Sequence, residues 1–313
     1  MKSVSELTDF YYKNLFPTLK NLEDKRKKVK ERMILISIIY TLLFALIAYA
    51  IGDFYEFILV AYIVLGTIIY KFLIKDYTHE FKLNVIKPLI HAIDNSLLYS
   101  STTHVSDYLF EHSNLFSKPD RLSGNDYVKG KIDNINIQFS DIHAQKRHKN
   151  SRGKESWSTL FQGLFLVADF NKHFYGETVV LPDTAQNSFG SLIGHWLQSN
   201  NISRDELVKM DDTEFEKEFV VYSSDQVEAR YILSNALMKK LLFFKEKSKH
   251  DIYISFIGAN IYMAISYEKD LFEPSIFSSL LEYKVAMEYI KTLHLAISVV
   301  KELKLNQRLW SKT

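Results

Sequence analysis

The sequence predicts an α+β protein that carries an N-terminal hairpin of two transmembrane helices. Three observations predict this fold: two adjacent apolar stretches near the N-terminus, a later region in which strand patterns dominate, and a C-terminal segment with helical periodicity. Strand and helix patterns are mixed in the later region and do not alternate regularly. We therefore expect a mixed, mostly antiparallel sheet with a long C-terminal helix, and not a doubly wound parallel sheet.

The two apolar stretches are residues 33–51 and 54–74. The first contains no charged residue, and its length matches the roughly 20 apolar residues that cross a bilayer. The second carries Glu56 and Lys71 near its ends. It crosses the membrane if both charges reach the interfaces, and it is a re-entrant segment otherwise. We expect a transmembrane hairpin over residues 33–74.

Basic residues flank the hairpin on both outer sides. Seven lysines and arginines lie between residues 20 and 32 and four lysines between residues 71 and 87, whereas the loop between the stretches carries only acidic charges. By the positive-inside bias, both termini are expected in the cytoplasm. The chain contains no cysteine, which suits a reducing compartment and excludes disulfides and thiolate nucleophiles. The net charge of +2 does not support a nucleic-acid binder.

Amphipathic helices are predicted on both sides of the hairpin. Residues 5–31 repeat leucine and tyrosine at helical spacing, with a kink expected at Pro17, and residues 81–97 repeat apolar residues in the same way around Pro88. Because a two-span hairpin returns the chain to one membrane side, these helices can pack together as a stalk. A self-association interface is the alternative. The predicted domains are a cytoplasmic amphipathic helix (1–32), the transmembrane hairpin (33–74), a stalk helix and connector (75–125) and a cytoplasmic α+β domain (126–313).

The α+β domain is predicted to begin near Asp126, where a connector rich in serine, asparagine and aspartate ends. A hairpin is expected at Asp133-Asn134, and the next two strands are expected to pair through the turn NKHFYG. The predicted strands are 128–132, 135–143, 158–170, 177–181, 216–222, 251–257 and 261–266. The predicted helices are 189–198, 226–230 with an N-cap at 223–225, 236–247 and a long terminal helix with Ala286, Ile290, Leu293, Ile297 and Val300 on one face.

Four segments together resemble an uncharacterised bacterial family of two-span membrane-anchored proteins with a cytoplasmic domain of unknown function. They are FQGLFLVADFNKHFYGETVVLPD, FEKEFVVYSSDQVEARYILSNALMKKLL, DLFEPSIF and the terminal LNQRLW, in this order. Members of this family are sometimes labelled galanin-like. The resemblance covers nearly the whole chain and implies a multi-pass protein of the bacterial inner membrane, but it implies no reaction, substrate or site residue.

The loop HAQKRHKNSRGK, residues 143–154, has the densest positive charge outside the juxtamembrane region. One interpretation is a solvated hairpin loop. The functional hypothesis is contact with anionic lipid headgroups. Nucleic acid is not expected as a partner, because aromatic residues are not interleaved with these cations. The headgroup candidates are Lys146, Arg147, Lys149, Arg152 and Lys154.

Two aspartates and two histidines are the candidates for a catalytic site. Asp141 and His143 lie two apart on one predicted strand and so share a face, and Asp169 and His173 lie at the end of the next. They could converge in an acid/base site, although surface pairing and turn chemistry explain them as well. The chain lacks a phosphate loop, a dinucleotide fingerprint, HExxH, GxSxG and kinase signatures. No metal and no cofactor are therefore expected.

The pattern of a complete anchor and a domain without catalytic signatures favours a non-enzymatic function. We expect a membrane-anchored binding, scaffold or sensor protein, whose partners are the lipid bilayer and a protein or a second copy of the chain. One alternative is a membrane-tethered enzyme that uses the Asp/His cluster. Another is a subunit of a membrane complex assembled through the hairpin, in which Gly66 and the alanines at 45, 48 and 50 permit close helix approach.

Overall fold

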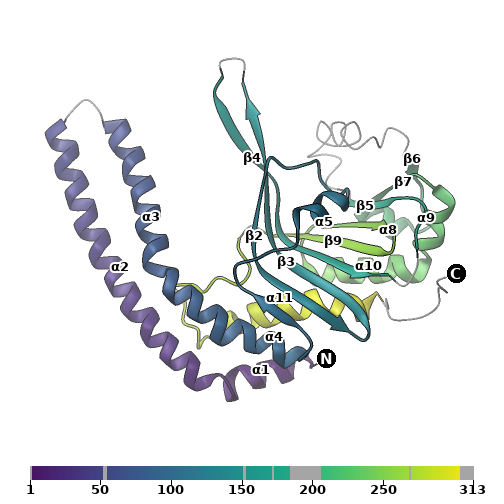
Figure 1. Ribbon diagram of the computed structural model, residues 1–313, viewed down its shortest axis with the longest axis horizontal. Coiled ribbons are helices and arrows are strands. Elements are labelled where there is room, and N and C mark those ends of the chain that lie inside the picture. The colour runs from purple at the N-terminus through teal and green to yellow at the C-terminus, as the bar shows by residue number, and fades with distance from the viewer. Residues whose placement is uncertain are drawn as a thin grey trace. The chain divides into compact units, whose positions relative to one another are not determined.

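The structure is a computed structural model that describes residues 2–51, 55–150, 153–170, 173–183, 206–267 and 269–303. It confirms the α+β class, with two long apolar helices near the N-terminus, one antiparallel sheet and a C-terminal helix (Figure 1). The chain divides into two compact units. The first consists of Met1–Ile93 and Phe272–Lys291, and the second of Asp94–Leu271 and Thr292–Thr313.

The first unit is helical. Its elements are α1 (Val4–Lys13), α2 (Phe16–Ile51), α3 (Tyr55–Phe81), the π-helical turn η1 (Lys82–Ile86), α4 (Lys87–Ile93) and the beginning of α11 (Tyr283–Glu302). The helix predicted over residues 5–31 with a kink at Pro17 is instead interrupted at residues 14 and 15, between α1 and α2. Pro17 stands in the first turn of α2, where a missing N–H breaks no helical hydrogen bond. The helix continues without a break from α3 through the π-helical turn into α4, of which Pro88 is the second residue.

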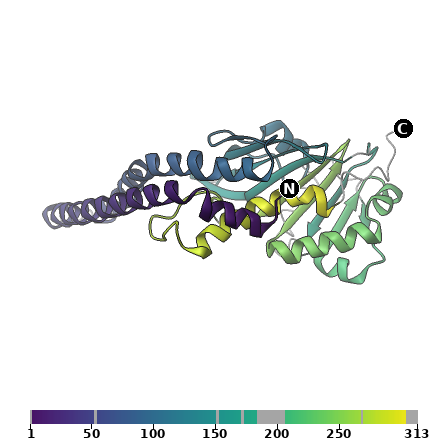
Figure 2. The same cartoon turned by 90° about the horizontal axis from the view of Figure 1, so that it is seen from below.

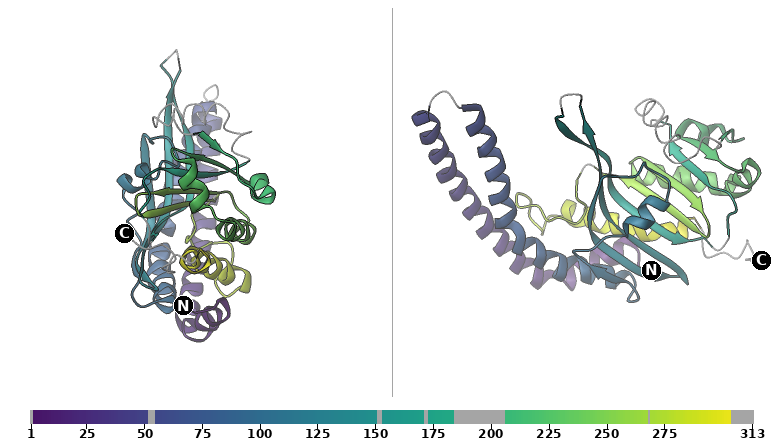
Figure 3. Two further views of the ribbon diagram at one scale, coloured as in Figure 1. Left: turned by 90° about the vertical axis from the view of Figure 1, so that its right-hand side faces the viewer. Right: turned by 45° about the horizontal axis from the view of Figure 1, so that its top comes forward.

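Helices α2 and α3 are both long and apolar enough to cross a membrane, and their most apolar windows are 0% buried. The two helices lie side by side (Figures 1 and 3). Tyr40 stacks on Tyr62 with 4.8 Å between ring centroids, and its hydroxyl donates to the Tyr62 carbonyl at 2.5 Å. A Cβ on Gly66 would lie 3.5 Å from Tyr40 Cε1. Gly66 is therefore in contact with the neighbouring helix of the same hairpin.

The amphipathic stripes that flank the hairpin are buried within the first unit. Helix α1 packs against α4, and α2 contacts η1. Tyr11 and Phe81 are completely buried, and the Tyr11 hydroxyl donates to the Leu280 carbonyl at 2.8 Å. Burial raises the pKa of the Tyr11 hydroxyl, with smaller contributions from nearby tyrosines and Glu23. Segment 272–291 thus completes the core of this unit.

The second unit contains a sheet of nine strands within the described residues, in the order β1-β2-β3-β4-β9-β8-β5-β7-β6 and with antiparallel neighbours throughout. The strands are β1 (Leu98–Ser100), β2 (Arg121–Ile132), β3 (Ile135–Lys149), β4 (Glu155–Asp169), β5 (Thr178–Pro182), β6 (Glu206–Val208), β7 (Phe219–Ser223), β8 (Ile252–Ile257) and β9 (Asn260–Ser266). The helices are α5 (Asp107–His112), α8 (Thr213–Glu218), α9 (Gln226–Ile232), α10 (Asn235–Ser248) and the later part of α11.

Both faces of the sheet are covered. On one face, Phe110 and Leu115 from the α5 region belong to a buried cluster with Phe161, Phe165 and Tyr262 of the sheet. Helix α10 lies along the other face together with the later part of α11 (Figure 2). Strands buried on both faces need apolar residues in succession, which explains the unbroken run from Leu164 to Ala168 in β4.

Some sequence predictions are confirmed and others are wrong. Asp133 and Asn134 both have positive φ, 47° and 68°, as expected for the predicted two-residue hairpin turn. The predicted pairing of strand 158–170 with strand 177–181 is wrong, because β4 pairs with β3 and β9, whereas β5 pairs with β8 and β7. The predicted strand over 216–222 begins as α8, which Asp212 caps. The predicted helix at 189–198 lies outside the described residues.

Candidate functional site

Strands β3 and β4 extend beyond the rest of the sheet as a two-stranded arm (Figures 1 and 3). The last residue of β3 that pairs with β2 is Gln145, and β9 pairs with β4 only from Gly163 onward. Residues 146–149 and 155–158 pair only with each other, and the register shifts between Ala144 and Gln145, where the arm begins. We call residues 146–158 the basic arm.

The basic arm carries five of the chain's cations and one carboxylate, Glu155. Arg147, Lys149 and Lys154 are exposed, and the Lys146 side chain is 36% exposed. Arg152, the fifth headgroup candidate, lies outside the described residues. The structure therefore places four of the five candidates on one narrow ribbon, where lysine and arginine heads reach solvent.

Asp120 holds the base of the arm. Its Oδ2 atom accepts the backbone N–H of Arg147 at 2.9 Å and lies 3.7 Å from Lys146 Nζ. Lys146 Nζ also donates to the Lys118 carbonyl at 2.8 Å. The Arg147 N–H, helped by the charges of Lys146 and Arg147, lowers the pKa of the Asp120 carboxyl. These contacts orient the start of the arm and leave its outer half exposed.

Trp157 is the residue of the arm that sequence reasoning missed. It pairs in register with Arg147, its side chain is 40% exposed, and the Arg121 guanidinium lies 4.3 Å from its ring centroid. Tryptophan combines an apolar ring with a polar N–H and is enriched at membrane interfaces. The signal that could have found it is its position just after the basic loop, several residues before the apolar run of the same strand.

Asp141 and Asp169, the two acidic candidates, do not share one site. Asp141 lies opposite Leu164 of β4, five residues before Asp169, which corresponds to about 16 Å along the strand. Asp141 is 3% exposed, and its Oδ2 accepts the N–H of Leu271 at 3.0 Å. The Asp141 carboxylate therefore fastens the chain that follows β9, and it is separated from Asp169 by more than the reach of an acid/base pair.

The two histidines also lie in different surroundings. His143 Nε2 lies 3.1 Å from Thr159 Oγ1, and the His173 ring stands edge-on to Tyr175 with 5.6 Å between centroids. No group of three or more His, Cys, Asp or Glu side chains that could hold a metal is present within the described residues. His195, which the sequence places beside Trp196, lies outside those residues.

A surface hollow of about 1020 Å³ lies between α8, α10 and the end of β9. Its walls carry both lysines and acidic residues. Lys245 Nζ, for example, lies 3.0 Å from Glu218 Oε2 and 3.9 Å from Asp251 Oδ1. This balance of charge does not favour an anionic or a cationic ligand, and the basic arm remains the better candidate site.

Comparisons with known proteins agree with an uncharacterised family. Residues 159–305 match the family model described as "Protein of unknown function (DUF3137)". No curated protein matches the chain. Among solved structures, the crystal structure of the mycobacterial trehalose monomycolate transport factor A, TtfA, is similar with a TM-score of 0.36 and 8% identity, over 69% of this chain and 93% of that chain. A similarity this low carries no argument about function.

Proposed function

We propose that this chain is a non-enzymatic, membrane-anchored scaffold or sensor protein of the bacterial inner membrane, with both termini in the cytoplasm. Helices α2 and α3 are its anchor, and the basic arm binds the anionic headgroups of phospholipids. The observation that carries the proposal is the extension of β3 and β4 beyond the sheet, with exposed cations along it and the half-exposed Trp157 near its base.

Charge and tethering both support this reading of the arm. Each lysine or arginine near an anionic membrane surface contributes about 1 kcal/mol, and Glu155 offsets part of this because its carboxylate lies 3.4 Å from Arg147 Nη1. The arm would thus gain a few kcal/mol from headgroups. Since the hairpin keeps the arm at a high local lipid concentration, weak contacts are sufficient for binding. If the protein is a sensor, the extent to which the arm binds the membrane would report the anionic lipid content of that membrane.

The separation of the Asp/His candidates supports a binding function over catalysis. Asp141 is buried and accepts a hydrogen bond from the Leu271 N–H. Asp169 lies on β4, five residues beyond Leu164, the residue opposite Asp141. General acid/base catalysis needs groups within hydrogen-bond reach of one substrate. A binding protein has no such requirement.

The proposal can be tested with the full-length chain reconstituted in phosphatidylcholine vesicles with and without phosphatidylglycerol. Because the chain contains no cysteine, Ser156→Cys gives a single site for an environment-sensitive dye on the exposed end of the arm. We expect the dye emission to shift to the blue when phosphatidylglycerol is present, and the shift to disappear at high salt, since headgroup attraction is screened.

Charge variants make the test specific. Lys149→Gln with Lys154→Gln should remove most of the shift. The matched control is Lys129→Gln with Lys131→Gln, which removes two exposed charges from β2 of the same sheet and should leave the shift unchanged. An emission that ignores phosphatidylglycerol, or equal losses in the two double variants, would overturn the proposal.

A further inference from the structure

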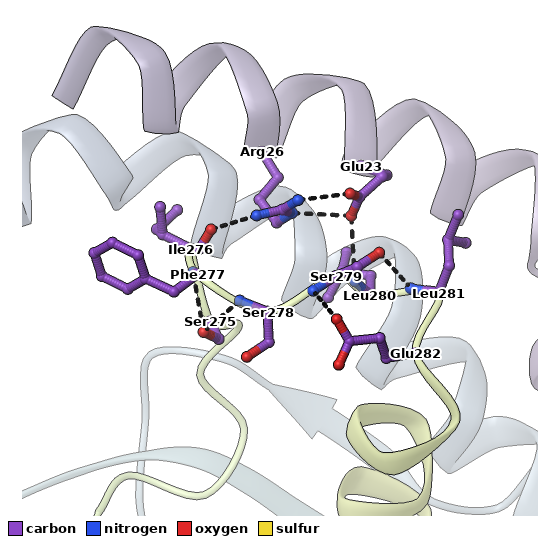
Figure 4. A network of polar contacts seen from close by, with 10 residues as sticks. All are labelled: Glu23, Arg26, Ser275, Ile276, Phe277, Ser278, Ser279, Leu280, Leu281 and Glu282. Carbon is purple, nitrogen blue, oxygen red and sulfur yellow. Dashed lines mark hydrogen bonds and ion pairs between the residues drawn. The ribbon is translucent and has the colours of Figure 1, made fainter. Parts of the chain in front are cut away.

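The segment between β9 and α11 returns to the first unit and is clamped there by one buried ion pair on α2 (Figure 4). Arg26 donates to the Glu23 carboxylate from Nε at 2.9 Å and from Nη2 at 2.7 Å. Its Nη1 donates to the Ile276 carbonyl, and Glu23 Oε2 accepts the Leu280 N–H at 3.2 Å. We call residues 272–282 the return loop.

The return loop is held at further points along its length. Ser275 Oγ accepts the N–H groups of Phe277 and Ser278, each at 3.1 Å. Lys82 Nζ forms an ion pair with Glu273 Oε1 at 2.6 Å, and the Lys82 side chain is only 5% exposed. The backbone at Phe277 is therefore fixed relative to α2 and η1 within this unit.

Phe277 is nevertheless exposed. Its side chain is 66% exposed, and Figure 4 shows the ring projecting away from the loop, beyond Arg26 and away from Glu23. Lys30 Nζ lies 6.0 Å from the ring centroid. Lys30 precedes Met33, the start of the uncharged stretch, by three residues, which is about 4.5 Å along a helix. The ring thus lies at the level where the apolar part of α2 begins.

The burial pattern places the same boundary on both helices. On α2 the last buried residue before the apolar stretch is Arg26, and on α3 the first one after it is Tyr77, whose hydroxyl pKa is raised by burial. Between residues 33 and 74, no described side chain with an assigned exposure is buried. Phe277 therefore lies at the junction between the protein-covered part of the unit and the part whose side chains are open to the surroundings.

We propose that Phe277 is an interfacial membrane anchor, with its ring inserted at the boundary between the headgroups and the acyl chains of the bilayer that α2 and α3 cross. An aromatic ring is stable at this depth, and Lys30 can extend its ammonium to the headgroups alongside it. The inference rests on the membrane anchorage in the proposed function, but not on the basic arm. It adds a third membrane contact, from a segment that follows the sheet in the sequence.

The experiment uses the full-length chain in vesicles of phosphatidylcholine and phosphatidylglycerol, with one spin label attached to one introduced cysteine. Phe277→Cys reports on the proposed anchor. Ile39→Cys, at an exposed position of α2, is the reference inside the bilayer, and Tyr283→Cys, at an exposed position at the start of α11, is the reference in water. Oxygen concentrates in the bilayer and a nickel chelate stays in water, so their collision rates with each label measure its depth.

We expect the label at 277 to collide more with oxygen than with nickel, as at 39, and the label at 283 to show the opposite order. A label at 277 that behaves like the one at 283 would overturn the inference, and so would one shielded from both reagents, because a protein surface would then cover it. If the label at 39 also collides mainly with nickel, the membrane anchorage itself fails. Phe277→Trp provides a second readout, since brominated lipids should quench its added emission.

Discussion

Replacing Arg26 with methionine should release the return loop from α2 at a large cost in stability. The Arg26 and Glu23 side chains are 8% and 6% exposed, so the change would leave a buried carboxylate without its counter-charge. Breaking one partner out of a buried ion pair costs about 3–5 kcal/mol. The Ile276 carbonyl would lose its hydrogen-bond donor as well. The free energy of this lost hydrogen bond should not be added in full to that of the broken ion pair, because the two contacts share the Arg26 side chain.

A compensating variant separates the buried charge from the lost contact. In Glu23→Gln with Arg26→Met the charge is gone, and the glutamine oxygen can still accept the Leu280 N–H. We expect this double variant to recover all but about 1–2 kcal/mol of the stability, because neutral replacements of a buried pair are tolerated. Lys25→Met is the control on the same helix. Its pair with Glu80 is exposed by 44% and 38%, so its loss should cost at most about 1 kcal/mol.

The measurement is urea unfolding of the full-length chain in detergent micelles, together with hydrogen exchange of the amides at 275–282. The Arg26 variant should exchange the Leu280 amide much faster than the parent chain, and the Lys25 control should not. The reasoning is refuted if Arg26→Met costs less than the Lys25 control, or if the double variant is no more stable than the Arg26 single variant.

Three further perturbations have clear expected outcomes. Gly163→Ala should prevent β4 from pairing with β9, because φ is +145° and the new Cβ would lie 2.2 Å from the Ile265 carbonyl oxygen. We expect the free energy of unfolding to fall by more than about 3 kcal/mol. The readout is the loss of the circular dichroism spectrum of the folded protein. Gly66→Ala should be nearly neutral and Gly66→Leu should cost about 1–3 kcal/mol by displacing Tyr40, as an SDS titration in mixed micelles would show; equal stability of the two would contradict this packing. Hydrogen bonds from Arg26 lower the pKa of Glu23 below its usual 4.5. The stability that the Glu23 charge contributes is therefore present above pH 4.5 and is lost as the pH falls through the lower folded pKa. Glu23→Gln should reduce this loss of stability at acid pH, and an unchanged loss would assign it to other carboxylates.

Local sequence was sufficient to predict those features of the structure that depend on interactions between residues close together in the chain. The turn at Asp133-Asn134 needs positive φ at both positions, a preference that asparagine and aspartate carry themselves. Asp225 caps α9 through the N–H groups of Val227 and Glu228, as its position before the helix predicted. The clustering of Lys146, Arg147, Lys149 and Lys154 on one ribbon likewise follows from a hairpin that closes on itself.

Longer-range pairing could not be predicted in the same way. Strand β5 was expected beside β4, but the β8–β9 hairpin, which comes much later in the chain, lies between them. Any apolar strand of suitable length satisfies the same pattern, so the choice depends on packing across the whole sheet. The surroundings of Trp157 and Asp141 could not be predicted either. The tertiary structure leaves Trp157 40% exposed on the arm and buries Asp141, which accepts the Leu271 N–H.

The sequence by itself determined the apolar hairpin, the amphipathic stripes, the mixed α+β class and the concentration of charge at residues 146–154, because composition and periodicity express each of these locally. Only the tertiary structure decided which of the cationic side chains are buried and hold other parts of the chain in place. Arg26 belongs to a run of cations just before the apolar stretch of α2, a pattern that predicts solvated charge, yet it is 7% exposed and donates to a loop 250 residues later in the chain. The physical reason is that its partners, a carbonyl and a carboxylate with a shared hydrogen-bond network, meet only when the return loop folds back onto α2.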